Sequence, residues 1–469
     1  MANNSRTIPD DELVSAIELL HQLIPEEELR VYSLRHSPAT VYTTLTTLWM
    51  LTLQRLAGGK SLEAIVKETL THHREIFPDN KRVREGTLSK NSSAFSEARS
   101  RLLLPDAERF VDSVANSIID SVPDILNDRR AFIMDGTTFK LAPTSNLREV
   151  YPPASNQHGE TVWPILLLTV AHELRSGAAL RPEFGAMYGS KNTSEAKQAM
   201  AIAKRIPPGS IVLADSGYGI FGVVHAVLAE GHDLLFRLTA SRFQSMHRKA
   251  ELIDQTTTSK CYRLCWKPSS KDRKTHPDLP ADAQIEVELH EIELDGGEKL
   301  YLVTSMTLTS EQAAELYARR YDVEHDIRDL KVTLGVENIR AQSDEMVRKE
   351  ILCSMVAYNL VVQLRREAAK FAKLPPRRLS FTGVWNTMQS CLLHQTGADL
   401  MTWQERYARA IEMASKDKLP HRPGRSYPRR AHPRRPKSTK FMKIATSLDQ
   451  KKGNSNAADD DKPPPDDRK

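Results

Sequence analysis

AFIMDG at residues 131–136 and IVLADSGY at residues 211–218 are the stretches that decide the expected fold of this chain. Each opens with four apolar residues that do not alternate with polar ones, which is typical of a strand buried on both faces of a sheet. Both runs end in an aspartate, Asp135 and Asp215. Taken alone, either aspartate would more often cap a turn or a helix. In an open sheet, however, side chains at the carboxyl ends of neighbouring strands converge on the ligand-binding crevice, so we expect these two to lie together.

A third carboxylate is expected on a helix over residues 317–331, YARRYDVEHDIRDLK. Tyr317, Arg320, Glu324 and Lys331 stand at successive spacings of three, four and seven, which places them within an arc of roughly 60° on a regular helix. Because burying three charges is very costly, this face is predicted to meet solvent, a metal ion or a phosphate. A solvated, salt-bridged surface is the commoner reason for such a face.

The two aspartates and Glu324 together form an oxygen-rich set of ligands. Hard divalent ions such as Mg²⁺ bind carboxylates, water and substrate phosphate at the same time, so the three residues predict a Mg²⁺ site. The sequence has no Gly-rich phosphate loop of the nucleotide-binding kind, and we therefore expect no nucleotide cofactor.

The order of these motifs resembles a known family. The pattern Tyr-x2-Arg-x3-Glu-x6-Lys, downstream of an Asp-Gly and an Asp-x-Gly-Tyr that each end an apolar run, is similar to that of the insertion-sequence-four family of bacterial DDE transposases. The resemblance extends over about residues 37–437 and includes the stretches 95–99, 234–238 and 357–361. One departure is Ser216, where many members carry arginine, and it leaves the three carboxylates in place.

The resemblance implies an α/β fold. A ribonuclease-H-like catalytic core would be interrupted by an antiparallel β insertion and accompanied by a helical N-terminal DNA-binding domain and a basic C-terminal region. The expected boundaries are 1–125 for the N-terminal domain, 126–238 and 307–372 for the two parts of the core, 239–306 for the insertion, 373–445 for the helical and basic C-terminal region, and 446–469 for a disordered tail.

The resemblance also implies a reaction and its participants. Asp135, Asp215 and Glu324 would be catalytic and would hold Mg²⁺, for which Mn²⁺ substitutes. Strand nicking would be followed by a hairpin intermediate and by insertion into target DNA. The partners would be double-stranded DNA, both terminal inverted repeats and target, and a second copy of the chain as a homodimer in the DNA complex. The residues implied as DNA contacts are Tyr317, Arg320, Lys331, Trp266, Arg237 and Arg99.

Two of these implied contacts have a simpler explanation. Trp266, the base-stacking residue by its place in the insertion, is equally expected as a strand aromatic that packs on the insertion's own core. Arg99 and the other cations around a short helix near Phe95 are equally expected as ordinary solvated charge.

Local patterns predict the remaining elements. Residues from about 10 to 125 show helical periodicity, with Ser61 as an N-cap before a helix over 62–70. Elsewhere the expected elements are a hairpin of strands 162–173 and 180–188, a capped helix over 194–205, and insertion strands over 262–267, 284–294 and 299–306.

The composition is that of an ordinary cytoplasmic protein. The 469 residues carry a net charge of +6, and no window approaches the eighteen or so apolar residues of a membrane span. The N-terminal residues lack a signal-peptide pattern. The four scattered cysteines are expected as reduced thiols. Cys261 and Cys265 are predicted to share one face of a strand, in preference to a zinc site.

Residues 419–443, which we call the basic strap, contain nine cations and no acidic residue. Five prolines argue against a helix, and an extended run of guanidinium groups suits a DNA backbone; a solvated linker is the alternative. Residues 447–469 are expected to be disordered, so the aspartates at 459–461 are not metal ligands. The strap arginines expected to contact DNA are Arg425, Arg429, Arg430, Arg434 and Arg435.

Two other functions share these features. A structure-selective nuclease of the same fold would need the three carboxylates but has no reason to carry the Tyr-Arg-Glu-Lys set. A domesticated or inactive DNA-binding protein would more often have lost a carboxylate, and this chain keeps all three. A transposase therefore accounts for more of the sequence.

Overall fold

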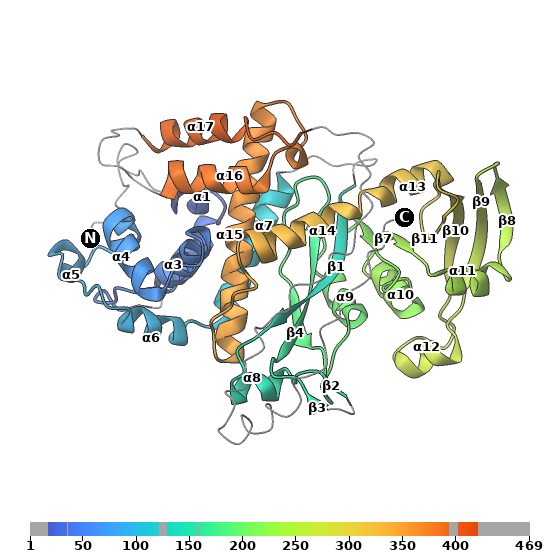
Figure 1. Cartoon of the computed structure of the whole chain (residues 1–469), viewed down its shortest axis with the longest axis horizontal. Helices are drawn as coiled ribbons and strands as arrows, with labels where there is room; N and C mark the ends of the chain where they lie inside the picture. The colour runs from blue at the N-terminus through green and yellow to red at the C-terminus, as the bar shows by residue number, and fades with distance from the viewer. Residues whose placement is uncertain (1–16, 35, 122–128, 157–158, 394–401, 421–469) are drawn as a thin grey trace, which may run out of the picture. The chain divides into compact units, whose positions relative to one another are not determined.

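The computed structural model describes residues 17–34, 36–121, 129–156, 159–393 and 402–420 (Figure 1). Contacts group residues 1–419 into one compact unit, and its described residues form the fold given below. In this part of the chain no helix is long and apolar enough to cross a membrane. The strap arginines, at 425, 429, 430, 434 and 435, and the predicted disordered tail lie outside the described residues.

A nine-stranded sheet forms the centre of this unit. Its strands, in spatial order, are β5 (Glu183–Ala186), β4 (Ile165–Glu173), β1 (Ala131–Lys140), β6 (Ile211–Ala214), β7 (Asp233–Arg237), β11 (Lys299–Thr304), β10 (Ile285–Glu293), β9 (Ser259–Trp266) and β8 (Glu251–Gln255). Strands β1, β6 and β7 pair in parallel and the other neighbours pair antiparallel. A separate ribbon joins β2 (Ser155–Asn156) to β3 (Gly159–Glu160). The main sheet is therefore mixed but mostly antiparallel.

The two apolar runs occupy the middle of this sheet, as their sequence predicts. The first four residues of β1 and all four residues of β6 are buried. Helices α9 (Glu195–Ala203) and α10 (Phe221–Ala229) pack on the strands around them and on each other. The hydroxyl of Ser194 caps α9 by accepting a hydrogen bond from the N–H of Lys197, which confirms the capped helix. Continuous apolar runs are required here because both faces of the strands are covered.

The N-terminal part is helical, as predicted. Ser61 caps α4 by accepting a hydrogen bond from the N–H of Ala64 at 3.2 Å. The helices in the described residues of this part are α1 (Ile17–His21), α2 (Glu26–Leu34), α3 (Thr44–Leu56), α4 (Leu62–His72), η1 (Arg74–Ile76), α5 (Lys81–Arg84), α6 (Ser93–Arg101) and α7 (Leu104–Asp120).

The 28-residue helix α15 (Asp344–Phe371) connects these helices to the rest of the unit (Figure 1). It packs against α3 and α7, and also against α16 (Phe381–Met388) and α17 (Trp403–Ala414). Near this junction, the Arg55 guanidinium donates to the Ser354 hydroxyl at 3.1 Å and to the Gly335 carbonyl at 2.7 Å. The N-terminal helices thus share a core with the residues that follow the sheet.

The predicted insertion contains its three expected strands, but they do not form a sheet of their own. Strand β11 pairs antiparallel with β7, with Leu302 opposite Arg237, so β8 to β11 extend the central sheet. This pairing satisfies the backbone groups that β7 would otherwise leave unpaired at an edge. The insertion also contains two helices that the alternating pattern did not predict, α11 (Ala240–His247) and α12 (Ser270–Thr275).

Candidate active site

Asp135 and Asp215 lie side by side on neighbouring strands. The parallel register of β1 and β6 pairs Ala131 with Ile211 and Ile133 with Leu213. Continued by two residues, the same offset sets Asp135 alongside Asp215. The convergence expected from the two apolar runs is therefore present in the fold.

The local setting of Asp135 differs from the expectation that its strand ends there. Strand β1 continues to Lys140, because its antiparallel pairing with β4 extends from Phe132 to that residue. Only the parallel pairing with β6 stops just before the aspartate. Asp135 is thus held mid-strand, whereas Asp215 follows the end of β6 and accepts a hydrogen bond from the N–H of Gly217 at 2.8 Å.

The segment over 317–331 is not the regular helix that its spacing predicts. Helix α13 (Ser310–Ala318) ends before Arg320, α14 (Tyr321–Arg328) follows, and Lys331 lies in a π-helical turn, η2 (Asp329–Thr333). At the break, the N–H of Arg320 bonds to the carbonyl three residues earlier, at 2.9 Å. The arc calculated for one regular helix therefore does not apply to the whole segment, although Arg320 and Glu324 still form an i,i+4 pair.

Arg320 joins two of the three predicted carboxylates. Its guanidinium lies 2.9 Å from Glu324 Oε1 and 3.5 Å from Asp135 Oδ2. The side chain of Arg320 is 13% exposed and that of Glu324 is 52% exposed. Helix α14 packs on β1, which explains how Glu324 reaches the aspartates. Glu324 thus stands at the solvent side of the site.

The electrostatics of Asp135 show how much negative charge gathers here. Burial raises the pKa of Asp135, and the charges of Asp215 and Glu324 raise it further. The Gly136 N–H, which donates to Oδ1 at 2.8 Å, and Arg320 oppose this rise in pKa without cancelling it. A divalent cation would relieve this charge, so the donor set fits the kind of ion that carboxylate oxygens prefer.

Tyr317 and Lys331 are the other two residues of the predicted Tyr-Arg-Glu-Lys set. Tyr317 is 4% exposed, and burial raises its pKa; the charges of Arg320, Arg237 and Asp215 also act on it. Lys331 donates to Thr137 Oγ1 at 3.1 Å and to the Thr138 carbonyl at 2.9 Å, which anchors it to β1. Burial lowers the pKa of Lys331. Arg237, at the end of β7, is a further, exposed cation of this site.

The sequence did not indicate one polar residue of this site, Glu195, and it indicated another, Tyr218, only as the last residue of the Asp-x-Gly-Tyr pattern. Glu195, the first residue of α9, lies so close to β1 that a Cβ added to Gly136 would be 2.2 Å from its Oε1. Tyr218 is fully buried, and the charges of Glu195, Asp135 and Asp215 act on its hydroxyl. A glycine inside a strand marks a close approach of another group, so Gly136 was the available signal.

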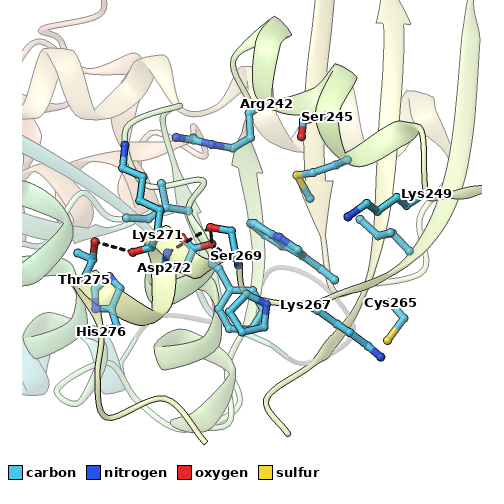
Figure 2. A pocket seen from close by; sticks show the side chains of 16 residues that line it. Arg242, Ser245, Lys249, Cys265, Lys267, Ser269, Lys271, Asp272, Thr275 and His276 are labelled. Atoms are coloured by element: carbon cyan, nitrogen blue, oxygen red, sulfur yellow. Dashed lines mark hydrogen bonds between the residues drawn. The ribbon is translucent and has the colours of Figure 1, made fainter. Parts of the chain in front are cut away.

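Trp266 lines a pocket of about 670 Å³ beside the Asp215 turn. Its ring meets Phe221 edge to face, with centroids 5.5 Å apart. Arg242 also lines the pocket and donates to the Ser216 carbonyl at 3.1 Å, which ties the pocket to the turn. Figure 2 shows the cations that surround it, Arg242, Lys249, Lys267 and Lys271.

The guanidinium of Arg99 is already paired inside the protein, unlike the free cation that was expected to contact DNA. Its side chain is 9% exposed, pairs with Glu350 at 2.5 Å, and lies over the Phe95 ring. The guanidinium is therefore occupied inside the protein, because α15 covers it. Exposed cations in the same part of the chain include Arg82, Arg84, Lys90 and Arg101.

Cys261 and Cys265 lie on the same strand, β9, as expected. Within the described residues, one group of three metal-binding side chains has all its ligand atoms within 4.8 Å of one another, namely Cys261, Glu288 and His290. Cys265 is exposed and takes no part in it. The predicted carboxylates are spaced more widely because Arg320 stands between Asp135 and Glu324.

Residues 126–360 match the sequence model of the family described as Transposase DDE domain. The match covers half of the chain, and the protein belongs to this family. It is a DDE transposase, an enzyme class that works on DNA with divalent metal ions.

Among solved structures, the chain is similar to one described as the cryo-EM structure of the piggyBac transposase synaptic complex with hairpin DNA. The similarity has 9% sequence identity and a TM-score of 0.40, and it covers 89% of this chain and 88% of that one. No curated protein gives a significant match.

Proposed function

We propose that this enzyme is an insertion-sequence-four transposase in which Asp135, Asp215 and Glu324 are the catalytic, metal-binding residues. The observation that carries this proposal is the parallel register of β1 and β6, which sets Asp135 and Asp215 at matching positions two residues further on, with Glu324 joined to Asp135 through Arg320. The strand order β5-β4-β1-β6-β7 supports a ribonuclease-H-like core. In that order β5, β4 and β1 form an antiparallel meander, and β6 and β7 continue in parallel beside β1.

The protein supplies a rigid frame for the carboxylates. Asp135 is held by its pairing with β4, and Asp215 by the turn that its own carboxylate closes with Gly217. We propose Mg²⁺ as the ion, with Mn²⁺ as a substitute; a bound pair of such ions supplies an activated water and stabilises the leaving 3′ oxygen of an in-line phosphoryl transfer. In the metal-free protein, Arg320 balances Asp135 and Glu324.

Around the carboxylates, Tyr317, Arg320, Lys331 and Arg237 are proposed to hold the DNA phosphate next to the cut. Lys331 is fixed to β1 by two hydrogen bonds, so it presents its charge at a defined place. The raised pKa of Tyr317 keeps its hydroxyl protonated as a donor at neutral pH. Positioned cations and donors of this kind stabilise the charge that develops in phosphoryl transfer.

The remaining parts are proposed to bind the DNA. Residues 1–125 would grip the terminal inverted repeats, using exposed cations of and near α5 and α6. The C-terminal region 373–445 would follow the DNA backbone, and two copies of the chain would assemble on paired ends. A supercoiled plasmid with candidate inverted repeats tests the function. Nicking that depends on these ends would support a transposase. Cutting that needs no ends would indicate a nuclease, and binding without cutting would indicate an inactive DNA-binding protein.

Deleting the basic strap, residues 419–443, is expected to weaken DNA binding and to flatten its salt dependence. Each lost phosphate contact should reduce the slope of log affinity against log salt by about 0.9, because fewer counterions are released. Fluorescence anisotropy at several salt concentrations measures this slope. Deleting residues 447–469 instead is the matched control and should leave the slope unchanged. An unaltered slope in the first deletion would mean that the basic strap does not contact DNA.

We also propose that the reaction passes through a DNA hairpin and that Trp266 stacks on a base drawn out of the duplex. The pocket beside Trp266 has cations on several sides and lies against the Asp215 turn, as a nucleotide with its phosphate would require. An aromatic wall and surrounding cations suit a single unpaired nucleotide, because every base has a face that can stack.

Trp266→Ala is expected to slow hairpin formation while the first nick still accumulates. The lost stacking is roughly 1–3 kcal/mol, or about 5- to 150-fold in rate. Denaturing gels of an end-labelled duplex separate nick from hairpin. Trp163→Ala removes an exposed tryptophan outside the pocket and is the control. Wild-type hairpin rates in a normally melting Trp266 variant would exclude a role in stacking.

A further inference from the structure

Glu195 brings a fourth carboxylate to the candidate site. It begins α9, and its Oε1 and Cδ would lie 2.2 and 2.4 Å from a Cβ on Gly136, the residue that follows Asp135. The carboxylate therefore rests directly on the β1 backbone, in a space that exists only because residue 136 has no side chain. Gly136 has no positive φ, so this space, and not the backbone conformation, is what requires glycine.

The surroundings of Glu195 are not those of an ordinary acidic residue at a helix start. Such residues are normally stabilised by the helix dipole, which favours the charged form. Here burial raises the pKa of Glu195, and the charges of Asp135 and Asp215 raise it further. In the described part of the chain no lysine or arginine forms an ion pair with Glu195, although Arg320 pairs with the other side of Asp135.

Tyr218 gives a second, independent sign that this space receives a ligand. Its side chain is fully buried, and its hydroxyl has no partner at full hydrogen-bond geometry among the described residues, although the Thr169 side chain is near enough to lower its pKa. The charges that act on this hydroxyl are those of Glu195, Asp135 and Asp215. A buried hydroxyl without a partner is costly, so its donor is available to a carboxylate or to a water drawn into the site.

We propose that Glu195 is a fourth carboxylate ligand of the divalent-cation site, positioned by Gly136 and by the hydroxyl of Tyr218. This inference rests on the proposed function of Asp135 and Asp215. Glu195 reaches the aspartates from α9, whereas Glu324 reaches them from α14, so carboxylates approach the two strands from two separate helices.

Binding of Mn²⁺ to the full-length protein, measured by isothermal titration calorimetry without DNA, tests this proposal. Glu195→Gln is expected to weaken Mn²⁺ binding roughly 10- to 100-fold. Gly136→Ala should also weaken it, because the new Cβ displaces the Glu195 carboxylate without removing any charge. Tyr218→Phe should have a smaller effect in the same direction. Glu251→Gln, on the exposed edge strand β8, is the matched control.

Thermal melting without metal separates a ligand from a structural residue. If Glu195 is a ligand held among like charges, Glu195→Gln should melt at the same temperature as the wild type or higher. A purely structural role predicts a lower melting temperature. Wild-type Mn²⁺ affinity in Glu195→Gln, together with lost affinity in Asp135→Asn, would overturn the proposed role of Glu195 and leave the proposed metal site in place. Unchanged affinity in both variants would instead overturn the proposed metal site.

Discussion

Asp135→Asn, Asp215→Asn and Glu324→Gln are each expected to reduce metal-dependent strand cleavage by about a thousandfold or more, equivalent to about 4 kcal/mol of transition-state stabilisation. Each amide keeps the shape of the side chain but removes the negative charge that a hard divalent ion requires. End binding in a gel-shift assay should survive, because these residues are proposed to hold metal and not the DNA ends. Cleavage of a plasmid with inverted repeats provides the measurement.

The structure indicates how the three variants should differ in stability. Asp135 lies partly buried among like charges, and its pKa is raised, so Asp135→Asn should leave the metal-free protein at least as stable as the wild type. Glu324 is exposed and should be nearly neutral for stability. Asp254→Asn, on the edge strand β8, serves as the control for loss of a carboxylate. Substantial cleavage by any of the three site variants would remove that residue from the proposed metal site.

Arg377→Met is expected to destabilise the protein by about 3–5 kcal/mol, because it leaves a buried charge without its partner. Asp326, two residues after Glu324 on α14, is 1% exposed. It accepts two hydrogen bonds from the Arg377 guanidinium, both at 2.7 Å. Arg377 also donates to the Leu174 carbonyl at 3.2 Å, which fastens α14 to the end of β4. Because the same helix carries Glu324, cleavage should fall together with stability.

Chemical denaturation measures the change in the free energy of unfolding. Arg328→Met is the matched control, since Arg328 is on the same helix but is 62% exposed and only 4.0 Å from its partner Asp329. A surface pair of this kind contributes at most about 1 kcal/mol. A loss of less than about 1 kcal/mol in Arg377→Met would show that the buried pair does not hold α14 in place.

The same pair predicts a dependence of stability on pH. Burial alone would raise the pKa of Asp326, but the charge and hydrogen bonds of Arg377 outweigh burial and hold this pKa below its usual value. A carboxyl whose folded pKa is depressed contributes stability above its unfolded pKa, about 3.9, and loses that contribution as pH falls through the folded pKa. In Arg377→Met burial is no longer outweighed by Arg377, so this contribution should shrink, and lowering the pH through about 3.9 should destabilise the variant less than the wild type.

Several elements could be predicted from the sequence because the patterns that indicate them are local. The apolar runs before Asp135 and Asp215 form strands, since four adjacent apolar residues must be covered on both faces wherever they lie. Ser61 caps its helix through a bond to a residue three positions away, so no distant partner is needed. The order of the short motifs was enough to indicate a DDE transposase, and the family match confirms that class.

Other features depended on partners far along the chain. Strand β1 runs past Asp135 because β4 pairs with it, and the guanidinium of Arg320 pairs with Asp135, which lies on β1. Arg99 is buried because Glu350, on α15, pairs with it. None of these partners is visible in local periodicity, which counts neighbours along the chain and not in space.

The sequence by itself determined the class of the protein, the central strands and the residue types that a metal-dependent reaction on DNA needs, because these follow from short-range patterns of apolar, charged and turn-forming residues. Only the tertiary structure decided that β7 pairs with β11, so that the insertion extends the central sheet. Likewise, only the tertiary structure places the side chain of Glu195 next to Gly136. The reason is that a strand edge or an open space beside a glycine can be filled from any part of the chain, and the choice is made by the packing of the whole core.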